Sequence, residues 1–293
     1  MHVFVTGGTG LIGSAVVSEL IRKGHRVTGL ARSDASARAL AAVGATALPG
    51  GITNLDVVRA GAKQAEGVIH LAFGNDFSSA EAITRAVAEE SAALQAIGGE
   101  LVGSGRPFVT VAGTPWIPGR LSTEIDRVAI EGPFGGRFRS VEAVLGLAAQ
   151  GVRSSAVRMP RTVHNDGKGG FAGLLTDIAR KSGVSGYPGD GRQRWPAVHA
   201  RDAAVLFRLA LESAPGGTVW HAVDDEGDKV SDIATVIGRR LGLPVESVPQ
   251  EHFGALGPIF AMDQPSSSEH TRRTLGWRPS HPSLLRDLES LRP

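Results

Sequence analysis

Short apolar runs alternate with stretches of helical periodicity along the first 112 residues. The β-branched run at residues 2–6 is typical of a buried parallel strand, and the helical spacing that begins at Leu11 ends at Gly24. The same patterns predict further strands at 25–30, 45–48, 67–72 and 107–112. They also predict one helix that ends at Val43, a second at 54–62, and a third at 79–101 that breaks or ends near Gly98 and Gly99. This alternation predicts an α/β fold with a Rossmann-type doubly wound parallel sheet.

The second half of the chain predicts a smaller, discontinuous lobe. One helical pattern begins at Arg137 or Ser140 and ends at Gln150, and others cover 169–181, 198–213 and 232–241. The segment 254–268 is rich in Gly, Pro and Ser, which indicates a loop. We expect a dinucleotide-binding Rossmann domain at 1–160, completed by about 196–226. A substrate lobe would then comprise 161–195 and 227–293.

Composition narrows the classes of partner. The net charge of +2 comes without a basic run, which argues against nucleic acid as a partner. The chain has no cysteine, which excludes disulfides, thiolate zinc sites and cysteine nucleophiles. No signal-peptide pattern precedes the first strand and no apolar run reaches membrane-spanning length. We therefore expect a cytoplasmic protein with no membrane partner, which acts on a small molecule.

A glycine-rich turn joins the first strand to the first helix, with the sequence Gly7-Gly8-Thr9-Gly10-Leu11-Ile12-Gly13. In a dinucleotide site, the first glycine permits a tight turn, Gly10 lets a pyrophosphate approach the backbone, and Gly13 lets the helix pack near the strand. The N–H groups at the helix N-terminus then face the phosphates. The alternative is a turn without a ligand. The strand before it and the helix after it favour the nucleotide site.

The end of the second strand bears on which dinucleotide binds. An NAD site usually has an acid here for the ribose 2′-hydroxyl, but Ala31 stands at that position. Arg32 and Ser33 can hold a 2′-phosphate instead, so NADP(H) is favoured over NAD(H). A solvated surface arginine is the alternative for Arg32. Asp34 or Ser33 could cap the next helix, and we expect Asp34 to do so.

Several motifs in order resemble the extended short-chain dehydrogenase/reductase family, also called the NAD-dependent epimerase/dehydratase family. They are the turn at 6–13, the strand at 68–72, and the segments at 158–163, 198–204 and 275–279. The resemblance implies cofactor contacts from the ends of the fourth, fifth and sixth strands, at Leu71, Ala72, Thr110, Met159 and Pro160. It also implies a homodimer through the two long helices that precede and follow the fifth strand.

Other positions depart from the family's pattern. The family uses a Tyr-x-x-x-Lys pair, but Tyr187 is the only tyrosine of this chain and Gly191 stands four residues after it. If Glu142 is the acid that follows the pair, Phe134 and Phe138 occupy the tyrosine and lysine positions. Ala112 stands where the family has its catalytic serine, and Thr110 or Thr114 could substitute for it. Gly51 replaces an aspartate that often binds adenine.

Three residues are the candidates for the missing proton donor, and each has a structural alternative. His164 titrates in the right range but could be a loop histidine that faces solvent. Thr114 could polarise a carbonyl or cap a turn. Tyr187 could close over the substrate or serve in packing. Arg192, Arg194 and Trp195 could contact an anionic or aromatic substrate or form a surface loop, and we expect His199 and His221 to be structural.

The sequence therefore predicts an NADPH-dependent oxidoreductase that reduces a small carbonyl or related unsaturated compound. Because the usual pair is absent, two alternatives stay open. One is a non-catalytic NADP(H)-binding sensor or regulator, and the other is a non-redox isomerase or lyase that uses the same pocket. No clustered His and carboxylate spacing suggests a metal.

Overall fold

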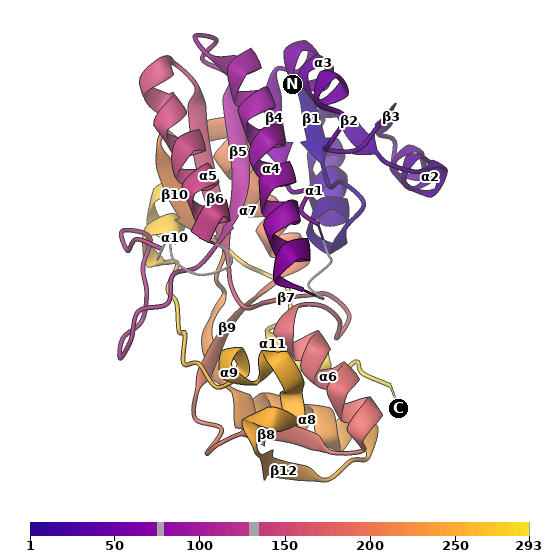
Figure 1. The fold of residues 1–293 in the computed structure, drawn as a ribbon, viewed down its shortest axis with the longest axis vertical. Helices are drawn as coiled ribbons and strands as arrows, with labels where there is room; N and C mark the ends of the chain where they lie inside the picture. The colour runs from indigo at the N-terminus through magenta and orange to yellow at the C-terminus, as the bar shows by residue number, and fades with distance from the viewer. Residues whose placement is uncertain (75–78, 129–134, 293) are drawn as a thin grey trace.

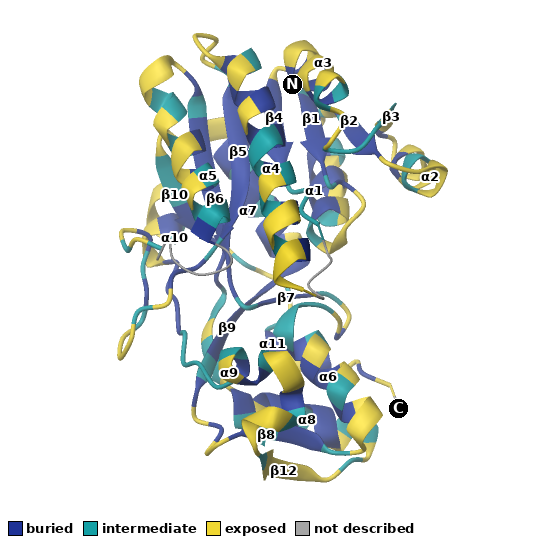
Figure 2. Ribbon diagram, viewed as in Figure 1, coloured by how far each residue is buried: buried dark blue, intermediate teal, exposed yellow. Residues whose placement is uncertain are grey.

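The computed structural model describes residues 1–74, 79–128 and 135–292. Figure 1 shows a larger upper part built on one sheet and a smaller lower part, near which the C-terminus lies. In Figure 2 the central strands of the upper part are buried, while its helices expose their outer faces. No helix in the described ranges is long and apolar enough to cross a membrane.

The upper part is a Rossmann-type doubly wound sheet, which confirms the predicted α/β class. Its strand order is β10-β6-β5-β4-β1-β2-β3, and all neighbours are parallel. The strands are β1 (His2–Thr6), β2 (Arg26–Ala31), β3 (Thr46–Pro49), β4 (Gly67–His70), β5 (Pro107–Gly113), β6 (Arg153–Met159) and β10 (Thr218–His221). The chain reverses direction across the sheet between β1 and β4, and ligands bind such folds at the carboxyl ends of the strands there.

Helices cover both faces of this sheet because its strands carry apolar side chains on both sides. One face is covered by α1 (Leu11–Arg22), α2 (Asp34–Ala42) and α7 (Ala200–Ser213), and the other by α3 (Leu55–Gln64), α4 (Ala80–Leu101) and α5 (Gly135–Gly146). Alternate residues of a strand point to opposite faces. Accordingly, Val3 and Val5 belong to the core under α1 and α7, while Phe4 belongs to the core under α3 and α4.

The lower part holds two small sheets and most of the remaining helices. One sheet has the order β11-β9-β7 and the other pairs β12 with β8. The elements are β7 (Thr162–His164), α6 (Gly170–Ser182), β8 (Ser185–Pro188), β9 (Arg194–His199), β11 (Asp225–Lys229), α8 (Val230–Leu241), β12 (Val245–Val248), α9 (Gly257–Phe260) and α11 (Leu284–Leu288). Short 3₁₀ helices lie at Leu147–Gln150 and Gln250–Leu256, and α10 (Glu269–Leu275) packs near β10 of the upper part. The predicted residue boundaries of the two domains stay a prediction.

Two expectations about local structure are wrong. The helix α4 does not break at Gly98, because this buried glycine lets Leu147 pack closely; a Cβ there would lie 2.7 Å from the Leu147 Cδ1. The stretch 254–268 is not a loop throughout, since it contains α9. Phe260 of this helix is fully buried, with its ring centroid 5.0 Å from that of Trp195. In both places, contacts between distant segments outweigh the local preference of glycine, proline and serine.

Candidate cofactor and substrate site

The carboxyl ends of the central strands open onto a cavity of about 780 Å³. Its wall comes from the segments that follow β1, β2, β3, β4 and β6, together with α4 and the start of α6. The predicted cofactor residues that line it are Gly7, Thr9, Gly10, Leu11, Ile12, Gly13, Arg32, Leu71 and Ala72. The fold therefore brings the glycine turn, the end of β2 and the end of β4 to one place.

The glycine turn is shaped by its own backbone and leaves one glycine open to the cavity. Gly7 has a φ of +69°, and a Cβ there would lie 2.7 Å from the Ala72 nitrogen. A Cβ on Gly13 would overlap the carbonyl oxygen of Gly7 and lie 2.8 Å from its carbonyl carbon. A Cβ on Gly10, by contrast, would meet only that oxygen, at an ordinary 3.6 Å. The fold itself thus requires Gly7 and Gly13, whereas Gly10 leaves room for a ligand.

The N-terminus of α1 has the chemistry that a pyrophosphate requires. The helix begins after Gly10 with no side-chain cap and no acidic residue in its first turn. Its first N–H groups therefore lack side-chain acceptors, and the positive end of the helix dipole is not neutralised. Together with the space above Gly10, these donors fit a dinucleotide phosphate.

The end of β2 provides a cation at the edge of the cavity. Arg32 is exposed and lines the cavity, and Ser36 of α2 lines it as well. Ser33 does not line it and instead caps α2, since its Oγ accepts a hydrogen bond from the Ser36 nitrogen at 3.2 Å. The expectation that Asp34 is the cap is therefore wrong, because the extended residue before the helix is Ser33 and Asp34 is already helical.

Among the described residues, the wall near β3 has no acidic side chain to bind an adenine amino group. Gly50, Gly51 and Ile52 form it, and the Gly51 nitrogen donates to the Asn54 Oδ1 at 2.8 Å. Adenine would meet backbone and an aliphatic side chain here.

Three other predicted cofactor residues, Thr110, Met159 and Pro160, lie buried behind the cavity wall rather than in it. Thr110 occupies the same register as His70 of β4, which in turn pairs with Thr6 of β1. The Thr6 Oγ1 and His70 Nδ1 are 2.9 Å apart. Burial lowers the pKa of His70 to about 3, so its ring is neutral near pH 7.

The place where the resemblance predicts the catalytic residues is lined by apolar side chains apart from Glu142 and Arg158. Ala112 of β5 lies in register with Arg158 of β6, and both border a small hollow together with Phe138 of α5. Arg158 donates to the carbonyl oxygens of Glu124 and Asp126 at 3.3 and 2.8 Å. The predicted tyrosine-position residue Phe134 lies outside the described residues. Among those described, none around this hollow carries a phenol or an amine.

The three candidate proton donors are not brought together, and none belongs to the described cavity wall. Thr114 is buried, and its carbonyl oxygen accepts from the Gln264 Nε2 at 2.7 Å. His164 is buried with its Nδ1 2.7 Å from the Asp287 Oδ2, so the solvent-facing alternative is wrong. Tyr187 packs against the core of the lower part. Catalytic roles for these residues stay predictions.

Other candidate residues have structural partners. Arg194 forms an ion pair with Asp263 at 2.8 Å, and Trp195 is fully buried in the lower core. Arg192 is a surface residue beside Asp190. The expectation for His199 is confirmed, because its Nδ1 accepts from the Arg201 nitrogen and caps α7. His221 is buried, with its Nδ1 2.8 Å from the Ser267 carbonyl oxygen.

Sequence reasoning missed two charged residues of the cavity wall, Glu89 and Arg161. Glu89 lies on α4, and Arg161 follows β6. The sequence offered one signal for Arg161, which is its place two residues after the end of a strand. Together with Arg32, these are the charged side chains of the described cavity wall.

Comparisons with known proteins agree with this arrangement. Residues 3–97 match the model of the NAD dependent epimerase/dehydratase family. The chain is similar to the uncharacterized protein C2A9.02 of Schizosaccharomyces pombe, with 43% identity over 99% of both chains. Its fold is similar to that of Pal from Bacillus thuringiensis, with a TM-score of 0.81 and 18% identity over 99% and 97% of the two chains. It is also similar to MoeE5 in complex with UDP-glucose and NAD, with a TM-score of 0.78 and 19% identity over 99% and 98%. The chain belongs to the NAD-dependent epimerase/dehydratase family of extended short-chain dehydrogenases/reductases.

Proposed function

We propose that this protein is an NADP(H)-dependent oxidoreductase that acts on a small carbonyl or related unsaturated compound. The observation that carries the proposal is the glycine turn opening onto one cavity that also contains Arg32. The N-terminus of α1 would hold the pyrophosphate, and Arg32 would pair with the 2′-phosphate. The further cofactor contacts predicted at Ser33, Thr110, Met159 and Pro160 have less support, since these residues do not line the cavity.

The protein's own part in the reaction is to orient the substrate. NADPH would supply the hydride when bound. No tyrosine, histidine or lysine lines the described cavity wall, and we propose that water protonates the product. Loss of a positioned acid costs about 10²–10⁴ in rate, whereas orientation of the reactants is worth about 7–11 kcal/mol. A slow but real hydride transfer is therefore compatible with these residues.

The proposal is tested by incubating the protein and NADPH with a panel of aldehydes, ketones and imines. Hydride transfer is measured from the absorbance of NADPH. We expect at least one member to be reduced with loss of nicotinamide absorbance. Tight NADPH binding without reduction of any member would count against an oxidoreductase.

The residues at the usual catalytic place also favour a second candidate function, a non-catalytic NADP(H) sensor. Ala112 and Phe138 cannot transfer protons, yet the protein has a cavity lined by the glycine turn and Arg32. A sensor should bind a partner protein differently when loaded with NADPH or NADP⁺. Pull-down experiments with each redox form would test this, and equal recovery of all partners would count against it.

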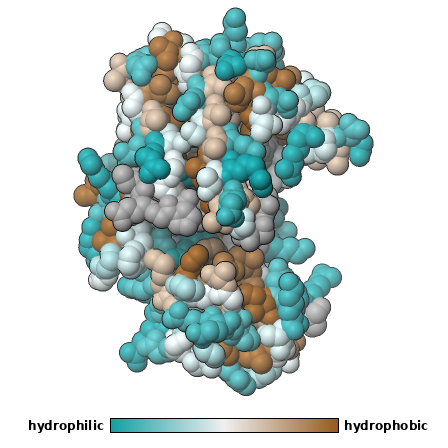
Figure 3. All heavy atoms as spheres, in the orientation of Figure 1, coloured by the Kyte–Doolittle hydropathy of each residue, from teal (hydrophilic) through white to brown (hydrophobic). Residues whose placement is uncertain are grey.

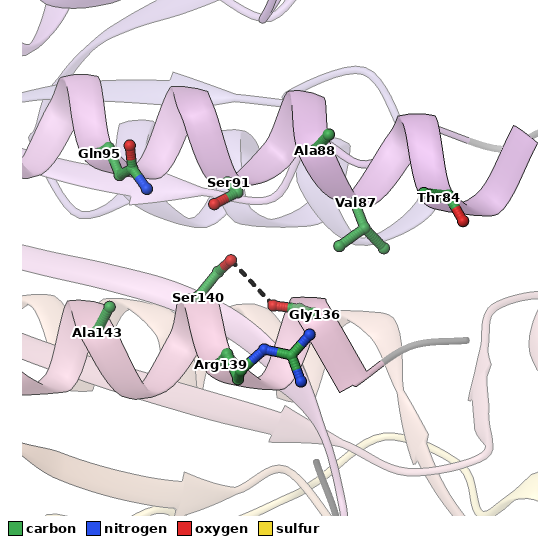
Figure 4. Close-up of a pocket in the computed structure, with 9 residues that line it drawn as sticks. All are labelled: Thr84, Val87, Ala88, Ser91, Gln95, Gly136, Arg139, Ser140 and Ala143. Atoms are coloured by element: carbon green, nitrogen blue, oxygen red, sulfur yellow. Dashed lines mark hydrogen bonds between the residues drawn. The ribbon is translucent and has the colours of Figure 1, made fainter. Parts of the chain in front are cut away.

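We also propose that the protein forms a homodimer through α4 and α5. A groove of about 580 Å³ lies between these helices, lined by Thr84, Val87, Ala88, Ser91, Gln95, Gly136, Arg139, Ser140 and Ala143. Figure 4 shows mostly small side chains along it, which would let helices of a second copy approach. Light scattering should give twice the chain mass, and Ala143→Arg should give the mass of one chain. A monomeric wild-type protein would contradict this proposal.

A further inference from the structure

Arg161 is a cation with few partners at the edge of the cofactor cavity. Its Nε is buried and has no hydrogen-bond partner. Its Nη1 donates to the Ile259 carbonyl oxygen at 3.0 Å, and the guanidinium carbon lies 5.2 Å from the centroid of the Phe171 ring. Within the described ranges, no Asp or Glu forms an ion pair with it. Burial lowers the pKa of Arg161 to about 10, which still leaves it charged near pH 7.

Two other arginines near the ends of β6, the partly buried Arg153 and the buried Arg158, have their partners within the protein. Arg153 donates to the carbonyl oxygens of Leu211 and Ala214 at 2.7 and 3.1 Å. Arg158 donates to two carbonyl oxygens and lies in the field of Glu124, Asp126 and Glu142. A buried charge without such partners is costly, because water no longer solvates it. Arg161 therefore has capacity for an anion that Arg153 and Arg158 lack.

The position of Arg161 separates it from the part of the cavity that fits the phosphates. It follows β6, whereas Arg32 follows β2, and β5, β4 and β1 lie between these strands. Four strand spacings of about 4.8 Å place the ends of β6 and β2 about 19 Å apart, and three spacings place the end of β6 about 14 Å from the end of β1, where the pyrophosphate would lie. The α1 N-terminus and Arg32 would neutralise the phosphates of a dinucleotide. An anion at the β6 end is then expected from a different molecule.

Arg161 also lies where the sheet meets the lower part. Its two contacts come from that part, the Phe171 ring of α6 and the Ile259 carbonyl of α9. Figure 3 shows hydrophobic residues gathered on the lower part just beneath the waist of the molecule. A group bound by Arg161 would thus have the cofactor cavity on one side and the lower part on the other. This is where a substrate would lie in a two-part enzyme.

We propose that Arg161 binds an anionic oxygen group of the substrate, a carboxylate or a phosphate. The inference rests on the proposed function, since the substrate is the molecule expected beside the cofactor. The guanidinium would hold the anion through its Nε and the remaining N–H groups, in the two-point geometry typical of arginine with such groups. Arg161 would then orient the substrate and select it by charge.

The test compares two anionic probes and one neutral probe that share a phenyl ring. Benzoylformate, its methyl ester and phenyl phosphate are titrated calorimetrically into the protein loaded with NADP⁺, which cannot give up a hydride. We expect benzoylformate or phenyl phosphate to bind at least tenfold tighter than the ester; which of the two does so identifies the anion. Arg161→Met should remove the preference and Arg161→Lys should keep part of it. Arg273→Met, which removes an exposed arginine of α10 outside the cavity wall, should change nothing.

Two results would overturn the inference. The first is equal affinity of the wild-type protein for both anions and the ester, a comparison that does not depend on any variant folding. The second is a tenfold loss of NADP⁺ affinity in Arg161→Met, which would make Arg161 a cofactor ligand. If NADP⁺ does not bind the wild-type protein, the proposed function fails. The same probes titrated into the free protein then decide on Arg161 separately.

Discussion

Two alanine substitutions in the glycine turn should separate folding from cofactor binding. At Gly13, a new Cβ would overlap the carbonyl oxygen of Gly7 and lie 2.9 Å from the Gly8 Cα. These are backbone atoms of the turn, so the strain cannot be relieved by a side-chain rotation. At Gly10, a Cβ would meet only one atom at 3.6 Å and would otherwise point into open space. Gly10→Ala should therefore fold, whereas Gly13→Ala should not fold normally.

The expected magnitudes differ in kind. For Gly13→Ala, forced displacement of a packed turn should cost about 3 kcal/mol or more of unfolding free energy, a large share of a typical total. For Gly10→Ala, the residue is extended at φ −75° and precedes the helix, so alanine should cost less than about 1 kcal/mol. Its Cβ would, however, stand where the pyrophosphate approaches. The Kd for NADPH should rise at least tenfold, or about 1.4 kcal/mol.

Urea unfolding and titration of nicotinamide fluorescence measure the two effects. Gly99→Ala is the matched control, because this exposed glycine lies within α4 and a Cβ there would meet nothing within 4 Å. The control should keep NADPH affinity and be stabilised by up to about 1 kcal/mol. Unchanged NADPH binding by a folded Gly10→Ala protein would refute the reasoning, since no phosphate could then lie against this turn.

Three further predictions concern ionisable groups that are buried or partly buried. Because burial holds the pKa of His70 near 3, neutral His70 costs the fold nothing above about pH 6.5, and stability is lost as the pH falls below that value. His70→Asn should remove a penalty of about 2 kcal/mol at pH 5, so the urea midpoint of the variant should change less between pH 7.5 and 5 than that of the wild-type protein. Burial, and then the charges of Asp225 and Asp232, raise the pKa of Asp228 to about 7. After allowance for solvent screening, Asp228→Asn should stabilise the fold by about 1 kcal/mol at pH 8 and not at pH 4, and equal effects at both pH values would contradict this. Glu90→Gln should destabilise the fold by about 2–3 kcal/mol because it leaves Arg137, 2.9 Å away, without its buried partner; a double-mutant cycle with Arg137→Gln should recover most of this loss.

The nucleotide half of the fold was predictable because its signals are local. A strand buried on both faces is a continuous apolar run, as at residues 2–6, and the turn that follows must contain glycine where its backbone is crowded. Leu71 and Ala72 were predicted from the family resemblance, and the structure places them in the cavity wall after β4, the strand beside β1.

The substrate side was not predictable because its properties come from distant segments. Arg161 lies over the ring of Phe171 and donates to the carbonyl oxygen of Ile259, which is 98 residues away along the chain. Likewise, the ring of His164 is buried and pairs with Asp287, which is 123 residues away along the chain. Periodicity and motifs carry no information about such pairs. The cap of α2 was missed for a simpler reason, since Ser33 and Asp34 are both good capping residues and only the backbone distinguishes them.

The central claim is that the cavity binds NADP(H) with Arg32 at its 2′-phosphate. Its most direct test is the titration of the wild-type protein and Arg32→Gln with NADPH and NADH, followed by nicotinamide fluorescence. We expect the wild-type protein to bind NADPH at least tenfold tighter than NADH, and Arg32→Gln to lose this preference with its NADH affinity unchanged. Equal affinity of the wild-type protein for both cofactors, or binding of neither, would contradict the account.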